Sequence, residues 1–431
     1  MKKTFRFLSM AALLVVGAIM TGCSNDDNID NPQQPANNNN VVTLTATVGF
    51  EANAETRAVD PSTGKKTFEG TNQIAVIYKN TSNETVKAVS TVFTPTGDNT
   101  TATFTVSLTN PASDGAIRYI YPATMAKTPA TDATITDDAA TIDYSGILSS
   151  QDGTLATLGT NYDLAVFDGS LSGTDLPASA TLTNPLAICK FTFKDTGSSD
   201  IPGITRLTVS NGTNAYAVST SGLDEIYVAM KPVASGNIAF TAATASKTYF
   251  RTITGKSLVA SKLYKNITVG SMVELAKGNV IGYDGNIYAS KSAAGSNAAA
   301  VIVYLGSDTY DATFKNGLAI ALADEADSNW STAMSTCGTK TAITGAKWCL
   351  PSQDQWNQMF KANGGNVESY TDLNTTINNA GGTILQSGFY WSSSEYSPGV
   401  GAHLVHLDDG DADWSKANET LGRKVRACLA F

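Results

Sequence analysis

Nine residues near the start of the chain read Val42-Thr43-Leu44-Thr45-Ala46-Thr47-Val48-Gly49-Phe50, and apolar side chains occupy every second position. Successive side chains of an extended strand point to opposite faces, so this alternation predicts a strand with one buried face and one exposed face. The buried face needs a second layer of structure to cover it. We therefore expect the fold to begin at Val42 with a strand of a layered β-protein.

Comparable runs follow, separated by turn-forming stretches such as Thr96-Gly97-Asp98-Asn99. No helical period is sustained before residue 280, and short strands at this spacing predict antiparallel β-sandwiches. The region is long for one sandwich, so we expect two, covering residues 41–172 and 173–275. The further expected strands are Gln73–Tyr78, Val86–Thr94, Thr101–Leu108, Ala116–Tyr121, Leu186–Phe193, Ile204–Ser210, Ile226–Met230, Thr248–Thr254 and Leu263–Val269.

The pattern changes after residue 275, where helix signals join the strand signals. Ser352-Gln353-Asp354-Gln355 reads as a capping box, and Trp356, Met359 and Phe360 then share one helical face. Strands are expected on both sides of this helix. Residues 276–431 are therefore predicted to form one α+β domain, in a chain that is otherwise mainly β.

The first residues have the form of an export signal. Basic residues precede the apolar run Leu8–Met20, which is too short to span a bilayer and is followed by Thr21-Gly22-Cys23. This arrangement resembles a lipobox, which implies that residues 1–22 are removed and that Cys23 is acylated. The polar residues 23–40 cannot bury a core, so we expect a disordered tether between lipid and fold.

The charge balance excludes several classes of partner. The chain carries 29 basic and 38 acidic residues, a net charge of −9. Such a surface repels phosphate backbones and anionic headgroups, so neither nucleic acid nor a basic membrane-binding site is expected. No further long apolar run occurs, so attachment to the outer membrane is expected to rest on the lipid alone.

Four phrases in residues 41–275 follow the tether and the first strand in a fixed order. They are Thr56-Arg57-Ala58, Thr67–Val76, Tyr119-Ile120-Tyr121-Pro122 and Lys262–Val269. In this order they resemble the fimbrillin family. The resemblance implies two stacked, transthyretin-like β-sandwich domains and assembly with other fimbrillin subunits by strand exchange at the cell surface.

The same resemblance assigns a role to Arg57 and Ala58. In fimbrillins a trypsin-like protease cleaves after an arginine behind the first strand, that strand leaves, and a strand of the next subunit enters the exposed groove. The Arg57–Ala58 bond matches that position, and cleavage there would also detach the lipid. The alternative is an ordinary surface arginine in a polar loop.

Residues 276–431 resemble a second family. They contain Trp348-Cys349-Leu350-Pro351-Ser352, Tyr390-Trp391-Ser392-Ser393-Ser394-Glu395-Tyr396 and Arg423-Lys424-Val425-Arg426-Ala427-Cys428. These phrases resemble lectin-like modules, which implies a C-type-lectin-like fold, shared with formylglycine-generating enzymes. The calcium-dependent sugar-binding tripeptides of C-type lectins are absent, so neither a metal nor another cofactor is expected.

Four cysteines remain when Cys23 is set aside. Cys189 alternates with apolar residues and is expected in a core. Cys337, Cys349 and Cys428 lie in the last domain, where an oxidising compartment makes one disulfide plausible. Cys337–Cys349 and Cys349–Cys428 both stay open, because spacing does not choose between them.

Aromatic residues are the best candidates for ligand contact. Tyr396 and Trp414 stand among Ser, Pro, Gly and Asp, whereas Trp348 and Trp391 read as core residues. His403 and His406 are three apart on an expected strand, so they point to opposite faces and do not share a metal.

The acidic run Asp408–Asp413 lacks the glycine and glutamate of an EF-hand loop and reads as a hairpin turn. No nucleophile elbow or phosphate loop occurs, so an enzyme is not expected.

These features predict a tip subunit of a fimbria. The last strand, Lys424–Phe431, reads as part of its own domain's sheet, so it is not expected to be donated to a neighbour. The terminal domain would present an adhesive surface to a glycan or protein on a host or bacterial surface. Two alternatives stay open: a fimbrial anchor that keeps its lipid, and a surface glycan-binding lipoprotein outside any fibre.

Overall fold

The computed structural model describes residues 40–50, 67–97, 99–364 and 369–431. Within these ranges the protein is mainly β, as predicted, with five sheets and short helices. The expected signal peptide, Cys23 and the tether up to residue 39 lie outside the described residues, as do Arg57 and Ala58. None of the helices in the described ranges has the length and apolarity needed to cross a bilayer.

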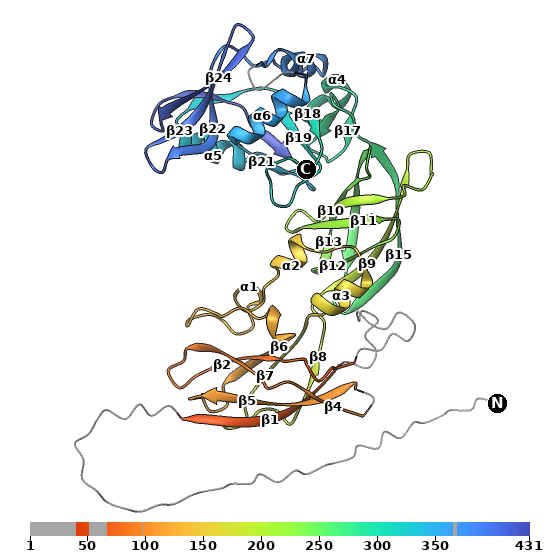
Figure 1. Ribbon diagram of the computed structural model, residues 1–431, viewed down its shortest axis with the longest axis vertical. Coiled ribbons are helices and arrows are strands. Elements are labelled where there is room, and N and C mark those ends of the chain that lie inside the picture. The colour runs from red at the N-terminus through yellow and green to blue at the C-terminus, as the bar shows by residue number, and fades with distance from the viewer. Residues whose placement is uncertain (1–39, 51–66, 98, 365–368) are drawn as a thin grey trace, which may run out of the picture. The chain divides into compact units, whose positions relative to one another are not determined.

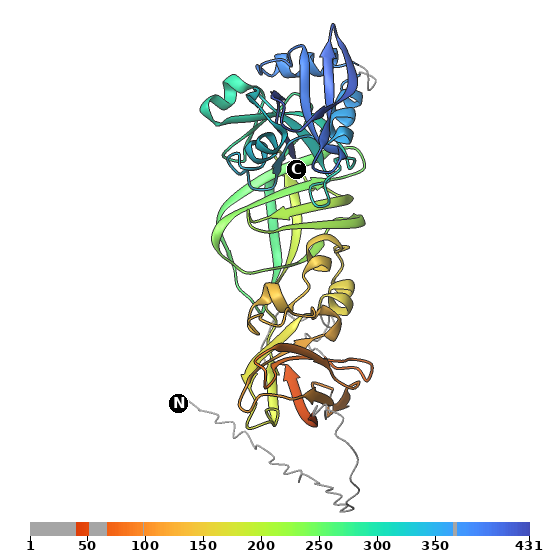
Figure 2. The same cartoon turned by 90° about the vertical axis from the view of Figure 1, so that its left-hand side faces the viewer.

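Two four-stranded sheets stack to form the first sandwich (Figures 1 and 2). Their facing surfaces enclose a core that is rich in aromatic rings, among them Phe68, Phe104 and Tyr119. The first sheet has the order β4 (Thr94–Thr96), β5 (Thr101–Thr109), β1 (Val41–Phe50) and β8 (Ser179–Leu182). The second has the order β3 (Thr85–Val89), β2 (Ala75–Lys79), β6 (Ala116–Tyr121) and β7 (Ala165–Ser170).

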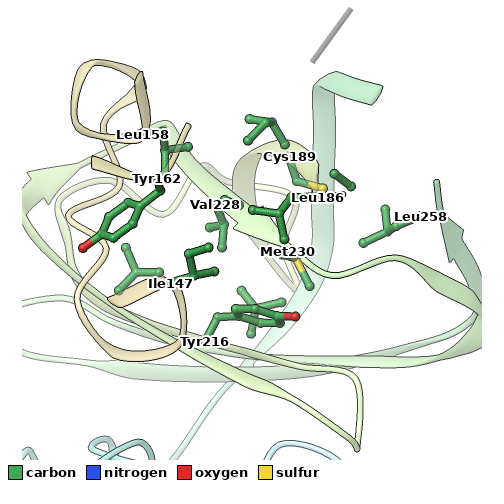
Figure 3. Packing of buried hydrophobic residues seen from close by; sticks show 14 of the residues in the cluster. Ile147, Leu158, Tyr162, Leu186, Cys189, Tyr216, Val228, Met230 and Leu258 are labelled. Carbon is green, nitrogen blue, oxygen red and sulfur yellow. The ribbon is translucent and has the colours of Figure 1, made fainter. Parts of the chain in front are cut away.

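Short helical turns between β6 and β7 were not expected from the sequence. They are η1 (Ala123–Met125), α1 (Asp138–Thr141), α2 (Ser145–Ser149) and α3 (Leu155–Asn161). Figure 3 shows Ile147 and Leu158 from this segment in one cluster with Cys189 and Val228. Gln151 adds polar contacts there, because its side-chain amide donates to the carbonyl of Ala229 and accepts from the Ala229 amide. Cys189 has no exposed surface, as its strand pattern predicted.

A seven-stranded sheet forms the middle of the chain. Its long strand β15 bends, pairing in parallel with β9 along most of its length and with β14 only near Glu274 (Figure 1). Both halves of the sheet contribute to one core, so the sheet folds over on itself as a sandwich. The order is β11 (Ala215–Leu223), β10 (Ile204–Ser210), β13 (Val233–Ala243), β14 (Thr248–Leu258), β15 (Lys262–Glu274), β9 (Ala187–Asp195) and β12 (Ile226–Met230).

The C-terminal region is α+β, as expected, and contains two sheets. One has the order β17 (Ile287–Tyr288), β16 (Val280–Gly282), β18 (Ala298–Leu305), β19 (Gly317–Ala321), β26 (Cys428–Ala430) and β21 (Lys347–Cys349). The other has the order β20 (Glu325–Ser328), β25 (Arg423–Val425), β22 (Gly388–Ser397), β23 (Gly401–Asp408) and β24 (Asp411–Asn418). The helical elements are α4 (Lys291–Ala294), η2 (Gly295–Asn297), α5 (Trp330–Gly338), α6 (Gln353–Ala362) and α7 (Thr371–Asn379).

Helix α6 begins as its sequence predicts. The Ser352 hydroxyl accepts from the Gln355 amide, and the Gln355 side chain accepts from the Ser352 amide, which completes the capping box. Trp356, Met359 and Phe360 are buried on the face that packs into the core. The helix therefore has the predicted start and the predicted buried face.

Strand β8 affects the expected division of the first two domains. It follows the expected boundary at residue 172, yet it pairs in parallel with β1 of the first sandwich, from Thr47↔Ser179 to Phe50↔Leu182. The first sandwich therefore includes residues up to Leu182. The sequence signal was weak because β8 has only four residues, too few to show a clear alternation. The domain boundaries themselves, and the transthyretin-like and C-type-lectin-like assignments, stay predictions.

Candidate functional site

Strand β1 is an inner strand of the first sheet and pairs with a strand on each side. It pairs antiparallel with β5 over nine positions, from Val41↔Thr109 to Gly49↔Thr101, and in parallel with β8 at its far end. It thus lies between β5 and β8 in the sheet order. If β1 left, both of these strands would keep unpaired backbone donors and acceptors along the vacated groove.

The inward residues of β1 fill part of the aromatic core. Leu44, Ala46 and Val48 are buried, and Val48 has 0 % exposed surface. Phe50 continues this face and stacks on Phe68, with ring centroids 4.2 Å apart. Burying Leu44 and Val48 alone is worth roughly 3–6 kcal/mol. The groove therefore offers an apolar floor as well as hydrogen-bonding edges.

The outward residues of β1 contribute much less. Thr43 and Thr45 contact Ser107 and Thr105 of β5 through hydroxyl groups, at 3.1 and 3.2 Å, in exposed positions. Thr47 is also outward and lies opposite Thr103. Exposed hydroxyl contacts of this kind compete with water and add little net stability. The strand is held by its backbone pairing and its inward side chains.

The sequence connects β1 to the remainder of the first sandwich through residues 51–66, which contain Arg57 and Ala58. A break of the Arg57–Ala58 bond would leave β1 bound only by non-covalent contacts. The structure does not describe this segment, so the processing role stays a prediction.

A second candidate site is an aromatic surface on β22, β23 and β24. Tyr396, His403 and Trp414 come from these three strands in turn, with ring centroids 6.1 Å apart between Tyr396 and His403 and 6.5 Å apart between His403 and Trp414. Tyr396 is 41 % exposed, and the other two rings are partly exposed. The Lys416 ammonium lies 5.1 Å from the Tyr396 ring centroid. We call Tyr396, His403, Trp414 and Lys416 the aromatic surface.

Local packing fixes two of these rings. The Tyr396 ring lies against Gly401, where a Cβ atom would collide with it, so the glycine allows the ring to lie close over β23. The indole N–H of Trp414 donates to the Asn357 side-chain oxygen at 3.2 Å. The surface is therefore held in place before any ligand arrives.

The sequence indicated Tyr396 and Trp414, but it did not reveal that His403 lies between them. Strand pairing produces this arrangement, because His403 lies opposite Lys416 and Val405 lies opposite Trp414. His406 is on the other face, as predicted, and stacks on Phe389 at 4.2 Å.

Three further aromatic residues of the C-terminal region are structural. Trp391 and Trp348 are buried, as expected, and their indole N–H groups donate to the carbonyls of Ser328 and Thr341. Tyr390 is also buried, and its hydroxyl donates to Asp324. These residues are not available for a ligand.

The acidic run forms a hairpin turn, as predicted. Asp408 pairs with Asp411, and the two residues between them have positive φ angles, 46° at Asp409 and 94° at Gly410. Both central residues of a type I′ turn require such angles. Across the described residues, no group of three or more His, Cys, Asp or Glu side chains is arranged to hold a metal ion.

The cysteines Cys189, Cys337, Cys349 and Cys428 are free thiols in the structure. The Sγ atoms of Cys349 and Cys428 are 3.6 Å apart, on paired positions of β21 and β26. Cys337 belongs to a different cluster of buried residues from Cys428. The structure thus brings together one of the two pairs that the sequence left open.

No protein-family model and no curated protein matches this chain. Its structural neighbours include cell-adhesion and fimbrial proteins. A protein assigned to cell adhesion from Bacteroides uniformis is 18 % identical, with a TM-score of 0.28, over 54 % of this chain and 97 % of that one. A fimbrial assembly protein from Parabacteroides distasonis is 8 % identical, with a TM-score of 0.28, over 54 % of this chain and 92 % of that one.

The tip fimbrial protein Mfa3 from Porphyromonas gingivalis, truncated at its C-terminus, is 10 % identical. Its TM-score is 0.24, over 50 % of this chain and 82 % of that one. Identities and TM-scores this low carry no argument about function.

Proposed function

We propose that this protein is an exported, lipidated subunit of a fimbria whose first strand, β1, is exchanged for a strand of a neighbouring subunit. One observation carries the proposal: β1 is the first strand of the described residues, yet it lies inside a sheet and fills an apolar groove. A groove of this kind binds a replacement strand through backbone hydrogen bonds and alternate inward side chains. The fimbrillin-like phrases in residues 41–275 support the same function.

The motifs at the N-terminus give the order of events. The chain is exported by residues 1–22, acylated at Cys23 and anchored in the outer membrane by that lipid. Cleavage at the Arg57–Ala58 bond then separates β1 and the lipid from the remainder of the chain. The groove becomes available only after the subunit reaches the surface.

We place the subunit at the fibre tip. Strand β26 lies between β19 and β21, and Phe431 has 0 % exposed surface, so this strand is not free for a neighbour. The C-terminal region instead offers the aromatic surface for adhesion to a glycan or a protein. The same region reads as a lectin-like module, and a non-enzymatic adhesive role agrees with both features.

Three experiments separate this proposal from its alternatives. N-terminal sequencing of protein recovered from assembled fibres should begin at Ala58, and Arg57→Gln should block assembly while the control Lys66→Gln does not. Fibres whose subunit still begins at Cys23 would exclude processing at Arg57. Immunogold labelling should then mark fibre ends, whereas labelled fibre bases would indicate the anchor subunit.

The second candidate function is a surface glycan-binding lipoprotein outside any fibre, which the aromatic surface favours. Aromatic rings stack on the apolar faces of sugar rings, and the neighbouring Lys416 and His403 provide polar groups. A glycan array probed with the full chain tests this binding. Trp414→Ala should abolish any signal, and Tyr310→Ala, at another exposed aromatic residue of the same region, should not. Glycan binding together with evenly labelled bare cell surface would favour this second function.

A further inference from the structure

Cys349 and Cys428 occupy directly opposed positions on antiparallel neighbours. Residues opposite each other in such a pair have Cα atoms about 4.5–5.5 Å apart, which falls within the range that disulfides bridge. The two side chains pack on the same side of the sheet, and their Sγ atoms are 3.6 Å apart. A bond needs only a small approach of the two sulfurs, without movement of either strand.

The third thiol of this region is placed differently. Strand alternation points Trp348 and Cys349 to opposite faces of β21, and Cys337 lies in the buried cluster that contains Trp348. Cys349 instead packs against the cluster that contains Cys428. The sheet therefore separates Cys337 from the side of the opposed pair.

We propose that Cys349 and Cys428 form a disulfide during export, and that this bond locks β26 against β21. The oxidant is the disulfide of an exported thiol oxidase. A Cys349 thiolate attacks one sulfur of that disulfide and releases a thiolate of the oxidase. A Cys428 thiolate then attacks the Cys349 sulfur and releases the second. The two cysteines lose two protons and two electrons, and the oxidase disulfide gains both the electrons and the protons and becomes a dithiol.

The environments of the two thiols fit this order of attack. Cys349 is partly exposed, whereas Cys428 has no exposed surface. Hydrogen bonding from Cys428 lowers the pKa of Cys349, and the Gln355 side-chain oxygen accepts from Cys349 at 3.6 Å. The same contact and burial raise the pKa of Cys428. Since the thiolate is the attacking species, Cys349 is the thiol that meets the oxidase first.

The bond would join positions 79 residues apart in the sequence. The intervening chain contains α6, α7 and the strands β22, β23 and β24 that carry the aromatic surface. Its closing strand, β26, is followed directly by Phe431, whose carbonyl accepts from the Asn316 and Gly317 amides. The disulfide would therefore close the part of the domain that presents the aromatic surface and hold its last strand in place.

Peptide mapping of the exported full chain tests the bond. The protein is denatured, alkylated without reduction and digested, and the expected product is a peptide pair joined through Cys349 and Cys428. Cys189 and Cys337 should be recovered alkylated. Recovery of both Cys349 and Cys428 as alkylated thiols, or of a Cys337–Cys349 pair, would overturn the proposal.

A stability measurement tests whether the disulfide stabilises the pairing of β26 with β21, and it does not depend on fibre assembly. All five tryptophans lie in the C-terminal region, so their fluorescence reports on its unfolding in the full chain. Reduction of the disulfide should lower the midpoint of thermal unfolding by roughly 10 °C in the wild type and in the control Cys337→Ser. The double variant Cys349→Ala with Cys428→Ala should not respond to reductant. An equal response in the double variant, or no response in the wild type, would refute the lock even if fibre assembly were normal.

Discussion

The sharpest consequence of the groove concerns Val48, which is inward and fully buried on β1. Val48→Ala removes two methyl groups worth about 0.8 kcal/mol each, and the partly unfilled space raises the total to about 2–3 kcal/mol. At 1.4 kcal/mol per factor of ten, the population with β1 released should rise by roughly 60-fold. Thr45→Ala is the matched control, because it removes only an exposed hydroxyl contact with Thr105 and should cost less than about 0.5 kcal/mol.

Hydrogen exchange followed by mass spectrometry measures this release directly. Amides between β1 and β5 should exchange roughly 60-fold faster in Val48→Ala, whereas β2 and β6 in the other sheet should change far less. Thr45→Ala should leave both sheets close to the wild type. If Val48→Ala instead accelerated exchange equally in both sheets, β1 would open only when the whole sandwich unfolds. It could not then act as an exchangeable strand.

Two further predictions concern the C-terminal region. Arg426 has no exposed surface, and its guanidinium lies 2.6 Å from the Asp324 carboxylate. Asp324→Asn should therefore lower the free energy of unfolding of this region by about 3–5 kcal/mol, measured by urea titration followed by tryptophan fluorescence. A decrease below about 1 kcal/mol would show that the ion pair is not needed. Burial disfavours ionisation of Asp311, but amide hydrogen bonds from Phe314 and Thr313 and the Lys347 ammonium outweigh it and lower the pKa of Asp311. Because the folded pKa lies below the unfolded value of about 3.9, this stability is present above that pH and is lost as pH falls towards the folded pKa. In Asp311→Asn the free energy of unfolding should therefore fall less steeply as the pH is lowered through the acid range. An unchanged pH dependence of unfolding would contradict this role of Asp311.

Alternation of side chains was enough to locate the regular strands. Ala116–Tyr121, Ile204–Ser210 and Ile226–Met230 have the predicted bounds, and the first strand differs by one residue. In each of them bulky apolar residues give a clear pattern. Strands β11 and β13 were missed because Ala, Ser and Gly occupy many of their positions and leave little contrast between faces. The helices between residues 138 and 161 were missed because they are too short to show a helical period.

In the candidate sites, the sequence pattern likewise did not predict which residues distant in the chain become neighbours. Tyr396 and Trp414 could be identified from their polar neighbours, but the place of His403 between them depends on the registers of β22, β23 and β24. The pairing of Cys349 with Cys428 likewise depends on the opposition of β21 and β26, which their separation in sequence does not predict. The buried ion pair of Arg426 explains why the phrase Arg423–Cys428 contains a charge in a core strand region. Local patterns identified these residues, and strand register determined their neighbours.

Direct replacement of β1 is the measurement that tests the central claim. A full chain carrying a site-specific protease sequence within residues 51–66 would be cut and incubated with an excess of isotope-labelled peptide of residues 41–50. Native mass spectrometry would then identify the bound strand. We predict that the cut N-terminal fragment is exchanged for one labelled peptide while the remaining chain stays folded. A chain that never takes up the peptide, or that unfolds once its own first strand leaves, would contradict strand exchange as the basis of its function.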